Sequence, residues 1–343
     1  MIPRGELDEF RIYSGGKNLN IPQMKIAHMT PRIPIIQGGM GVAVSLSGLA
    51  AAVANAGGIG TISGTGIPHE ELIYHIRRAR ELTKGQGYIG VNVLFAMVNF
   101  AETVKVAMKE KVDFIISGAG FSRDMYQWGR EYGVPIISIV SSAKLGKLAE
   151  RLGASALVVE GSEAGGHLGT DRPLFDILPE VLEAVNIPVI AAGGILTGQD
   201  IAKALGMGAV GVQMGTRFAA TDECDAHPAF KQKYVDCEEG ETLLVKTTVG
   251  LHGRAIRNPF IDRLLAEGKL KIERCDSCLK QCDHKFCTMD SLVRSVNGDV
   301  DNGLVFAGSR VTEIKEILPV QTIMDNLVKE LSDNLDKSEN AVS

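Results

Sequence analysis

Short apolar runs alternate with longer amphipathic stretches along most of this chain. The apolar runs are nearly continuous Val, Ile and Ala, as expected for strands of a parallel sheet that is covered on both faces. The amphipathic stretches have the length and periodicity of helices. Strands are expected at residues 34–38, 59–64, 88–94, 112–118, 134–140, 156–161, 188–194 and 210–215. Helices are expected between them at residues 45–56, 68–82, 100–110, 123–132, 143–152, 175–185 and 198–205.

This regular alternation of strand and helix predicts an α/β fold, a (β/α)8 TIM barrel. A barrel of this kind takes about 250 residues, so the chain must contain further parts. The amphipathic run near the C-terminus, residues 314–331, predicts a helix that packs back on the barrel. The expected division is a lead-in at 1–33, the barrel at 34–218, a mostly helical cap at 219–274, a cysteine-containing segment with the C-terminal helix at 275–331, and a flexible polar tail at 332–343.

Composition narrows the class of protein. Hydrophobic residues make up 45% of the 343 residues and aromatic residues 5%, which indicates a globular core of small and branched aliphatic side chains. The net charge is −5, and Lys and Arg form no dense stripe, which argues against nucleic acid as a partner. No apolar run is long enough to span a membrane, and the N-terminus lacks the apolar region of a signal peptide. We therefore expect a cytoplasmic protein with a small-molecule substrate, and the sequence leaves open whether it forms homo-oligomers.

Two glycine turns follow the seventh and eighth expected strands. The first contains Gly193 and Gly194, and the second contains Gly215 and Thr216. Glycine lets backbone N–H groups approach an anion closely, and we expect each turn to open toward a segment whose first amides are unpaired. In a TIM barrel the loops after strands seven and eight commonly hold a cofactor phosphate. The two turns therefore predict a phosphate site.

Other strand ends carry polar or soft side chains. Gly39 and Met40 follow the first strand, and Met40 offers an apolar surface suited to an aromatic ring. Asn92 lies within the third strand, where its amide must pair either with neighbouring backbone or with a ligand. Glu160 lies at the end of the sixth strand. Its carboxylate needs either hydrogen-bond donors, such as the hydroxyls of a sugar or ribityl chain, or an internal ion pair with Arg or Lys.

His167 is the leading candidate for a catalytic residue. It lies in the glycine-rich loop after the sixth strand, directly after Gly165 and Gly166. This loop would hold the imidazole over the mouth of the barrel, and an ordinary histidine pKa of about 6.5 suits proton transfer at neutral pH. His227 and His252 follow the barrel in the sequence and could line the far wall of the site.

Six sequence motifs resemble those of one group of flavoproteins. They are Gln37-Gly38-Gly39-Met40, Asn55-Ala56-Gly57-Gly58-Ile59-Gly60, Gly90-Val91-Asn92, Glu160-Gly161-Ser162-Glu163-Ala164-Gly165-Gly166-His167, Ala191-Ala192-Gly193-Gly194-Ile195 and Gln213-Met214-Gly215-Thr216-Arg217-Phe218. Together they resemble the FMN-dependent nitronate monooxygenases, formerly 2-nitropropane dioxygenases. They are equally similar to the closely related flavin enoyl-acyl-carrier-protein reductases. The resemblance covers residues 30–330.

The resemblance implies a TIM barrel that holds FMN. The phosphate would lie on the amides of the two glycine turns and the ring near Met40, with Asn92 and Glu160 in contact with the cofactor. The cofactor-binding residues implied by the motifs are Gly39, Met40, Asn92, Glu160, Gly165, Gly193, Gly194, Gln213, Met214, Gly215 and Thr216.

The two kinds of enzyme imply different reactions. In the monooxygenases the histidine that matches His167 acts as base on a neutral nitroalkane or orients an anionic nitronate, and O2 completes the conversion to a carbonyl compound and nitrite. In the reductases NAD(P)H reduces FMN, a hydride passes to an enoyl thioester, and the histidine assists at the thioester. Gly39 and Gly118-Ala119-Gly120 favour the reductases, whereas Phe121-Ser122 departs from their pattern. Nitronate monooxygenase is the first expectation, and an NAD(P)H-dependent enoyl thioester reductase is the alternative.

Four cysteines are concentrated after the barrel. Cys275, Cys278, Cys282 and Cys287 have the spacing C-x2-C-x3-C-x4-C, in a chain with only six cysteines. In a reducing cytosol a disulfide framework is not expected, so these residues are either plain thiols or ligands. Four thiolates suit an iron–sulfur cluster or a closed zinc site.

Overall fold

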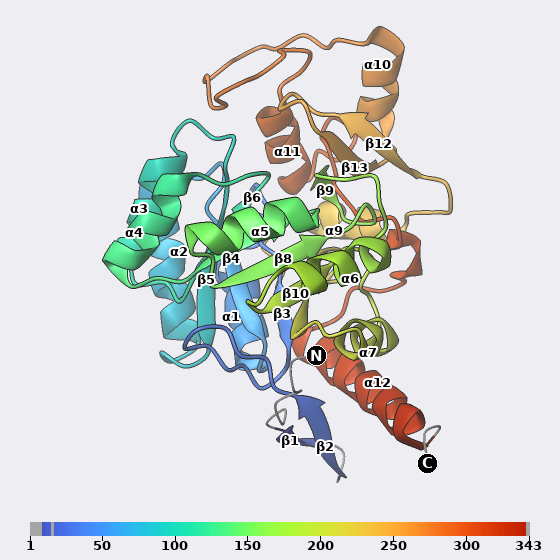
Figure 1. Cartoon of the computed structure of the whole chain (residues 1–343). Coiled ribbons are helices and arrows are strands. Elements are labelled where there is room, and N and C mark those ends of the chain that lie inside the picture. Colours follow the sequence, from blue (N-terminus) through green and yellow to red (C-terminus); the bar gives the residue numbers. More distant parts are fainter. Residues whose placement is uncertain (1–8, 15–16, 341–343) are drawn as a thin grey trace.

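The computed structural model describes residues 9–14 and 17–340, and its centre is a closed barrel of parallel strands (Figure 1). The strand order around the barrel follows the chain, and the last strand pairs with the first, with Met214 opposite Gln37. The predicted TIM barrel is confirmed. Its strands are β3 (Ile35–Gln37), β4 (Ile59–Ser63), β5 (Tyr88–Leu94), β6 (Ile115–Gly118), β7 (Ile136–Val140), β8 (Ala156–Glu160), β10 (Val189–Ala192) and β11 (Gly211–Met214).

The helices that follow these strands lie close to their predicted positions. Local signals set several of their ends: Ser122 and Ser142 cap α4 and α5 by accepting a hydrogen bond from an amide of the first turn. Gly133 and Gly153 end the same two helices in the left-handed conformation. The helices are α1 (Ser47–Asn55), α2 (His69–Leu82), α3 (Phe100–Lys109), α4 (Arg123–Tyr132), α5 (Ala143–Leu152), α6 (Leu174–Ala184) and α7 (Gly198–Gly206).

The strands are buried on both faces, which explains their continuous apolar sequence. One apolar cluster lies between the strands and the helices, and a second fills the interior of the barrel. In the interior, the ring of Phe114 fills the space left by Gly90. Met24 from the lead-in packs against Gly211, the first residue of β11, and so covers the end where the strands begin. The opposite end of the barrel is therefore the one available to a ligand.

The eighth helix of the barrel comes from the C-terminus. Helix α12 (Val320–Asn340) packs against both α7 and α1, so it occupies the place of the helix that would follow β11 (Figure 1). The predicted packing of a C-terminal helix on the barrel is confirmed. All residues between β11 and α12 thus form one insertion in the last strand–helix unit.

The limits of α12 differ from the prediction at both ends. The helix starts later than residue 314 because Pro319 disfavours helical backbone angles at the residue before it. That residue, Leu318, instead forms a strand-like bridge with Thr221. Residues of the expected tail at 332–343 continue the helix as far as Asn340, and residues 341–343 lie outside the described part of the chain. The flexibility of this end stays a prediction.

The expectation of a mostly helical cap is also wrong. The insertion contains the hairpin β12 (Thr242–Lys246) and β13 (His252–Ile256), and β13 also pairs with β9 (Gly166–Leu168) from the barrel loop. Gly250 permits the turn between the two strands with a φ of 84°. Two short strand-like runs around a glycine turn are a hairpin signal, which the helical interpretation overlooked. The remaining elements are α8 (Thr216–Ala219), α9 (Pro228–Val235), α10 (Pro259–Glu267), α11 (Thr288–Val296) and the 3-10 turn η1 (Val311–Glu313).

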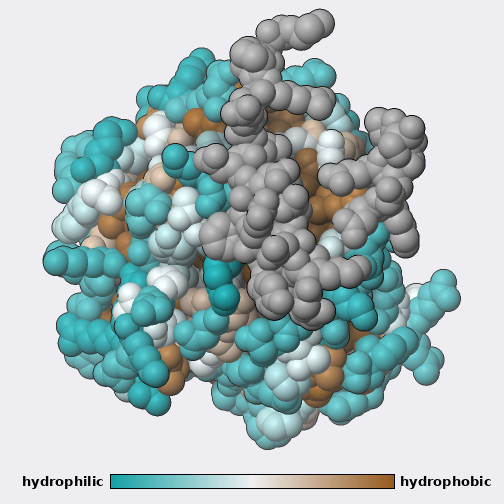
Figure 2. All heavy atoms as spheres, turned by 90° about the horizontal axis from the view of Figure 1, so that it is seen from below, coloured by the Kyte–Doolittle hydropathy of each residue, from teal (hydrophilic) through white to brown (hydrophobic). Residues whose placement is uncertain are grey.

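The lead-in forms a hairpin below the barrel. Its strands are β1 (Glu9–Ser14) and β2 (Lys17–Pro22), which pair in antiparallel fashion (Figure 1). Seen from below, the molecule is largely hydrophilic, with apolar residues scattered between hydrophilic ones (Figure 2). None of the helices in the described ranges combines the length and the apolar character that crossing a bilayer requires.

Asp225 connects the insertion to the first helix of the barrel. The N-terminal residue of α1 has no capping side chain of its own. Instead, the carboxylate of Asp225 accepts hydrogen bonds from the amides of Leu46 at 2.8 Å, Leu49 at 3.3 Å and Gly48 at 3.3 Å. A side chain from the insertion therefore satisfies the free amides at the start of α1.

We predict that Asp225→Ala lowers the free energy of unfolding by about 1 to 2 kcal/mol, since it removes this cap. Urea unfolding of the two proteins measures the difference. Asp236→Ala is the matched control, because Asp236 is an exposed residue that bonds only to Gln232 on the same helix, and we expect a change below about 0.5 kcal/mol. Equal losses in both variants would contradict the capping role.

Candidate functional site

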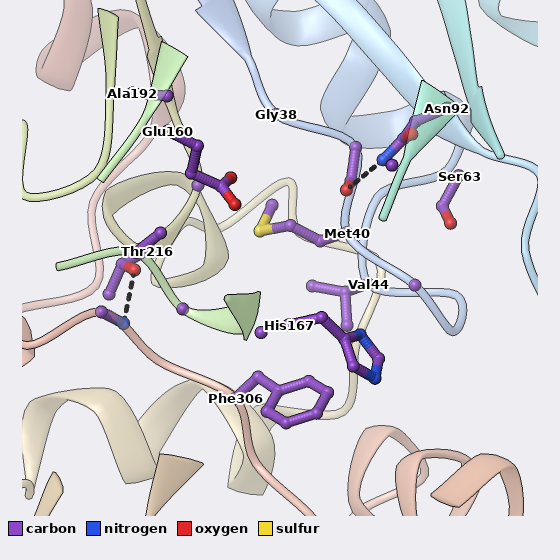
Figure 3. Close-up of a pocket in the computed structure, with 18 of the residues that line it drawn as sticks. Gly38, Met40, Val44, Ser63, Asn92, Glu160, His167, Ala192, Thr216 and Phe306 are labelled. Atoms are coloured by element: carbon purple, nitrogen blue, oxygen red, sulfur yellow. Dashed lines mark hydrogen bonds between the residues drawn. The ribbon is translucent and has the colours of Figure 1, made fainter. Parts of the chain in front are cut away.

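The strand ends and the insertion enclose a cavity of about 240 Å³ (Figure 3). Its walls come from the carboxyl ends of β3, β4, β5, β8, β10 and β11, from the loop around β9, and from the insertion. The structure brings every residue that the sequence predicts for the catalytic and cofactor site to this one cavity. These residues are Gly39, Met40, Asn92, Glu160, Gly165, His167, Gly193, Gly194, Gln213, Met214, Gly215 and Thr216.

The glycine turns lie where β10 and β11 end. Gly193 and Gly194 have φ values of 98° and 71°, which glycine adopts without strain. A Cβ on Gly193 would lie 3.1 Å from the carbonyl oxygen of Gly161. The hydroxyl of Thr216, at the start of α8, accepts a hydrogen bond from the amide of Gly308 at 3.0 Å (Figure 3). The backbone of both turns therefore borders the cavity with almost no side chain in between.

Arg310 from the insertion fixes the first turn. Its guanidinium donates to the carbonyl oxygen of Gly194 at 2.6 Å and to the carboxylate of Asp200 at 2.8 Å. Asp200 also accepts from the amides of Leu196 and Thr197. The expectation that the segment after this turn offers unpaired amides is therefore wrong, because Asp200 already uses them. An anion at this point can contact the turn itself and α8.

Asn92 and Gly39 join β5 to the loop after β3. The Nδ2 of Asn92 donates to the carbonyl oxygen of Gly39 at 2.9 Å (Figure 3). A Cβ at Gly39 would collide with the Asn92 side chain, so this loop position requires glycine. The Oδ1 of Asn92 is buried without a partner, as is the Oε1 of Gln213. The amide thus pairs with backbone through its nitrogen and has an oxygen to offer to a ligand.

Glu160 places a carboxyl group in the mouth of the barrel. Figure 3 shows this group directed toward the space beside Met40. Burial raises the pKa of Glu160 to about 7, and no cation contributes to the shift. The internal ion pair that the sequence left open is therefore not formed within the described residues. At neutral pH a substantial fraction of Glu160 is protonated and able to donate a hydrogen bond.

His167 lies on β9, which the hairpin of the insertion holds in place: His167 pairs with Gly253 of β13. Its ring packs edge-on against Phe306, with the ring centroids 5.4 Å apart (Figure 3). The Nε2 atom is buried without a hydrogen-bond partner. Burial lowers the pKa of His167 to about 4, so the imidazole is neutral at pH 7. Such a ring is a weak base, and its unpaired Nε2 donates a hydrogen bond in the tautomer that carries the proton there.

The loop that carries His167 is supported from two sides. Arg254 of β13 donates to the carbonyl oxygen of Ser162 at 2.9 Å. The carboxylate of Glu163 accepts from the amide of Leu174 at 2.9 Å. A Cβ on Gly165 would lie 2.7 Å from the backbone of Ala307, so the loop and the insertion are in close contact. The position of His167 is thus fixed by groups outside its own segment.

The other candidate histidines lie elsewhere. His227 begins α9, where its Nδ1 accepts a hydrogen bond from the amide of Ala229. His252 is exposed on β13. Neither lines the cavity, so the suggestion that they form its far wall is wrong.

Sequence reasoning missed the residues that the insertion contributes. Phe306, Gly308 and Arg310 lie between the cysteines and the last helix, in a segment without a recognisable motif. Apolar residues of the insertion add a further wall. The only signal in the sequence is the apolar run that ends in Gly308, and it does not show which part of the barrel it meets. The lining residues from this wall include Val249, Leu279, Thr288, Met289 and Leu292.

The four clustered cysteines line a second hollow, of about 430 Å³. All are free thiols. Across residues 9–14 and 17–340 no three His, Cys, Asp or Glu side chains are grouped so as to hold a metal ion. The closed zinc site that the spacing allows is therefore not formed. The residues concerned are Cys275, Cys278, Cys282 and Cys287.

The main cavity fits a flavin mononucleotide. Its glycine turns leave room for a phosphate, and Met40 offers an apolar surface. Three polar atoms are buried there without partners: Asn92 Oδ1, Gln213 Oε1 and His167 Nε2. Buried polar groups are nearly always hydrogen-bonded, so these atoms indicate a site for a polar ligand.

Among the solved structures that resemble most of this chain are FabK and a nitroalkane oxidase. FabK from Thermotoga maritima has a TM-score of 0.79 and 34% identity, over 91% of this chain and 96% of FabK. The nitroalkane oxidase from Streptomyces ansochromogenes has a TM-score of 0.77 and 26% identity, over 91% of this chain and 98% of the oxidase.

A curated relative and a family profile complete the comparison. The relative, from Rhodococcus jostii strain RHA1, is named (3aS,4S,5R,7aS)-5-hydroxy-7a-methyl-1-oxo-octahydro-1H-indene-4-carboxyl-CoA dehydrogenase. It is 32% identical over 238 residues. The match covers 69% of this chain and 66% of the dehydrogenase, which is just under two thirds of its length. The profile of the nitronate monooxygenase family matches residues 22–99 and 89–330. A match over most of the chain, on a barrel that gathers the family's motifs in one cavity, shows that this protein belongs to the nitronate monooxygenase family of flavin oxidoreductases.

Proposed function

We propose that this protein is an FMN-dependent reductase of the carbon–carbon double bond of an enoyl thioester. The observation that carries the proposal is the neutral imidazole of His167, whose Nε2 is buried in the cavity without a partner. This group donates a hydrogen bond well, but with a pKa of about 4 it removes a proton from carbon poorly. Reduction of an enoyl thioester needs a donor at the carbonyl oxygen, whereas oxidation of a neutral nitroalkane needs a base.

The shape of the cavity supports a substrate with a long apolar part. The glycine turns and Met40 lie at the end proposed for FMN. The lining also includes Val249, Leu279 and Met289 of the insertion. Apolar side chains at this point suit the acyl chain of a thioester, which a small nitroalkane lacks.

The relatives with the higher identities also favour a thioester as the substrate. FabK, an enoyl-acyl-carrier-protein reductase, has 34% sequence identity to this chain. The nitroalkane oxidase has 26%. The name of the Rhodococcus dehydrogenase includes a CoA thioester. The relatives with the higher identities, 34% and 32%, thus favour a thioester, whereas the relatives named for nitronate or nitroalkane oxidation are 28% and 26% identical.

Different residues of the cavity would have different roles in this reaction. Bound FMN would supply the two-electron hydride chemistry, with NAD(P)H as the electron donor. The glycine turns and Thr216 would hold the cofactor phosphate, and Asn92 and Gln213 would bond to its polar edge. His167 would donate from Nε2 to the thioester carbonyl oxygen, where negative charge develops during reduction. Glu160, when protonated, would donate a hydrogen bond to the cofactor.

Oxidation of an anionic nitronate is the second candidate. The observation in its favour is the nitroalkane oxidase, whose structure matches this chain over 91% of its length. A nitronate oxygen could accept the same hydrogen bond from His167, and this substrate needs no base. In this candidate His167 would orient the nitronate, which is one of the two roles that the sequence expectation gave it, and nitronate monooxygenase stays a prediction.

Anaerobic stopped-flow reduction separates the two candidates. We predict that NADH or NADPH bleaches the bound flavin rapidly and that a 2-enoyl-CoA, such as crotonyl-CoA, restores its colour. Propyl-2-nitronate, tested in parallel, should reduce the flavin slowly or not at all. Rapid bleaching by the nitronate, with none by either nicotinamide, would replace the proposed reductase by the second candidate.

We predict that His167→Ala keeps its FMN and loses about 10²- to 10³-fold in kcat with the enoyl thioester, the effect of removing one donor to a developing oxyanion. The rate of flavin reduction by NAD(P)H should change little, because His167 acts on the second substrate. His252→Ala, a change at an exposed histidine on the neighbouring strand of the same sheet, is the matched control and should behave as wild type. Wild-type turnover in His167→Ala would show that the histidine is structural.

Glu160 makes the stability of the FMN-free protein depend on pH. Its pKa is raised from 4.5 to about 7, so between these values the folded protein holds a proton that the unfolded chain has lost. Glu160 therefore lowers the free energy of unfolding as the pH rises from about 4.5 to about 7, by at most roughly 3 kcal/mol. His167 acts in the opposite direction between about pH 4 and 6.5, because its pKa is lowered from 6.5 to about 4. Urea unfolding should therefore show a shallow profile in wild type and in the surface control Glu131→Gln. In Glu160→Gln, where only the His167 contribution remains, the free energy of unfolding should rise with pH across this range, and a profile like that of wild type in this variant would refute the assignment.

A further inference from the structure

The loop between α10 and α11, at the top of the molecule, carries the four clustered cysteines (Figure 1). Their side chains line one hollow of about 430 Å³, which also receives His284 and Phe286. None of the four cysteines takes part in the proposed FMN site. Four thiols around one space therefore need a separate explanation.

This loop is held in place by backbone contacts with the barrel and the hairpin. The amide of Val98 donates to the carbonyl oxygen of Cys278 at 2.9 Å, and the amide of Lys280 donates to that of Ala96 at 2.8 Å. Further along, the amide of Asp283 donates to the carbonyl oxygen of Thr248 at 3.1 Å. These backbone hydrogen bonds fix the position of the loop that carries the cysteines, although most of the loop has no regular secondary structure.

The four cysteines line one hollow but are not grouped around a single ion. Zinc lies about 2.3 Å from each of its sulfur ligands, so four cysteines around one zinc ion leave no hollow between them. In the part of the chain that the structure describes, no three potential ligands are grouped tightly enough for one ion. A ligand shared by all four cysteines would therefore be larger than one ion.

The charged Asp, Glu, Lys and Arg side chains that line the hollow are balanced, since they are Asp276 and Lys280. Cys287 is the N-cap of α11, and its Sγ accepts a hydrogen bond from the amide of Asp290 at 3.4 Å. A helix N-terminus stabilises a thiolate at this position.

We propose that Cys275, Cys278, Cys282 and Cys287 bind one iron–sulfur cluster. Four thiolates are the usual ligands of such a cluster, and the hollow between the cysteines gives its iron and sulfide atoms room. The proposal is independent of the substrate proposed for the FMN site.

The cluster site shares a wall with the main cavity. Leu279, Thr288 and Met289 line both the hollow of the cysteines and the proposed FMN site. Leu279 also bridges to Met97, in the loop after β5. A cluster bound by the four thiolates would therefore lie one layer of side chains from the cavity, and its ligand loop forms part of the substrate wall.

The metal content of the full-length protein tests the proposal. Protein that is produced and purified without oxygen, or reconstituted with ferrous iron and sulfide, should contain about two or about four iron atoms and as many acid-labile sulfides per chain. Reduction with dithionite should produce an electron paramagnetic resonance signal of the cluster. One zinc per chain, or an iron-free protein after reconstitution in which all four thiols react with a thiol reagent, would overturn the proposal.

Substitutions assign the ligands. Cys278→Ser should lose the iron and sulfide while it keeps FMN, and the loop between α10 and α11 should become more sensitive to proteolysis. Cys237→Ala is the matched control, because Cys237 lies outside the loop, and it should retain both iron and FMN. FMN content reports folding in each variant. Full iron content in Cys278→Ser, or equal loss of iron in both variants, would contradict the assignment.

Discussion

The closure of parallel strands into a barrel is the constraint on which the site depends. Since the strands all run in one direction, their carboxyl ends meet at one end of the barrel, and the interior below is filled by side chains such as Phe114. Residues that end different strands, from Gly39 to Thr216, therefore share one cavity. No local interaction between these residues is needed to bring them together.

The insertion between β11 and α12 gives the cavity its chemical character. Without it the barrel would present its glycine turns to open solvent. The hairpin aligns β9 and so orients His167, and Arg310 reaches back to the carbonyl oxygen of Gly194. The helix that closes the ring, α12, can pack between α7 and α1 only after the chain has crossed the cavity. The same segment thus covers the site and completes the barrel.

Burial moves the two ionisable groups of the site in opposite directions. It raises the pKa of Glu160 to about 7 and lowers that of His167 to about 4. In both cases the cavity disfavours the charged form, because few polar groups are present to replace water. At pH 7 His167 is therefore neutral, whereas Glu160 is divided between its carboxyl and its carboxylate form. The neutral state of His167 is the electrostatic property that favours the reduction of a thioester-conjugated double bond in our proposal.

The sequence by itself determined the barrel and the location of the cofactor motifs. Continuous apolar strands and the glycine turns are local patterns. Each predicts its own local structure regardless of how the rest of the chain folds. The tertiary structure decided what no local pattern contains. A hairpin replaced expected helix because β13 could pair with β9, and Asp200 took up amides that the sequence left free. The protonation states of Glu160 and His167, and the hollow among the cysteines, likewise depend on burial by distant segments, which only the folded chain creates.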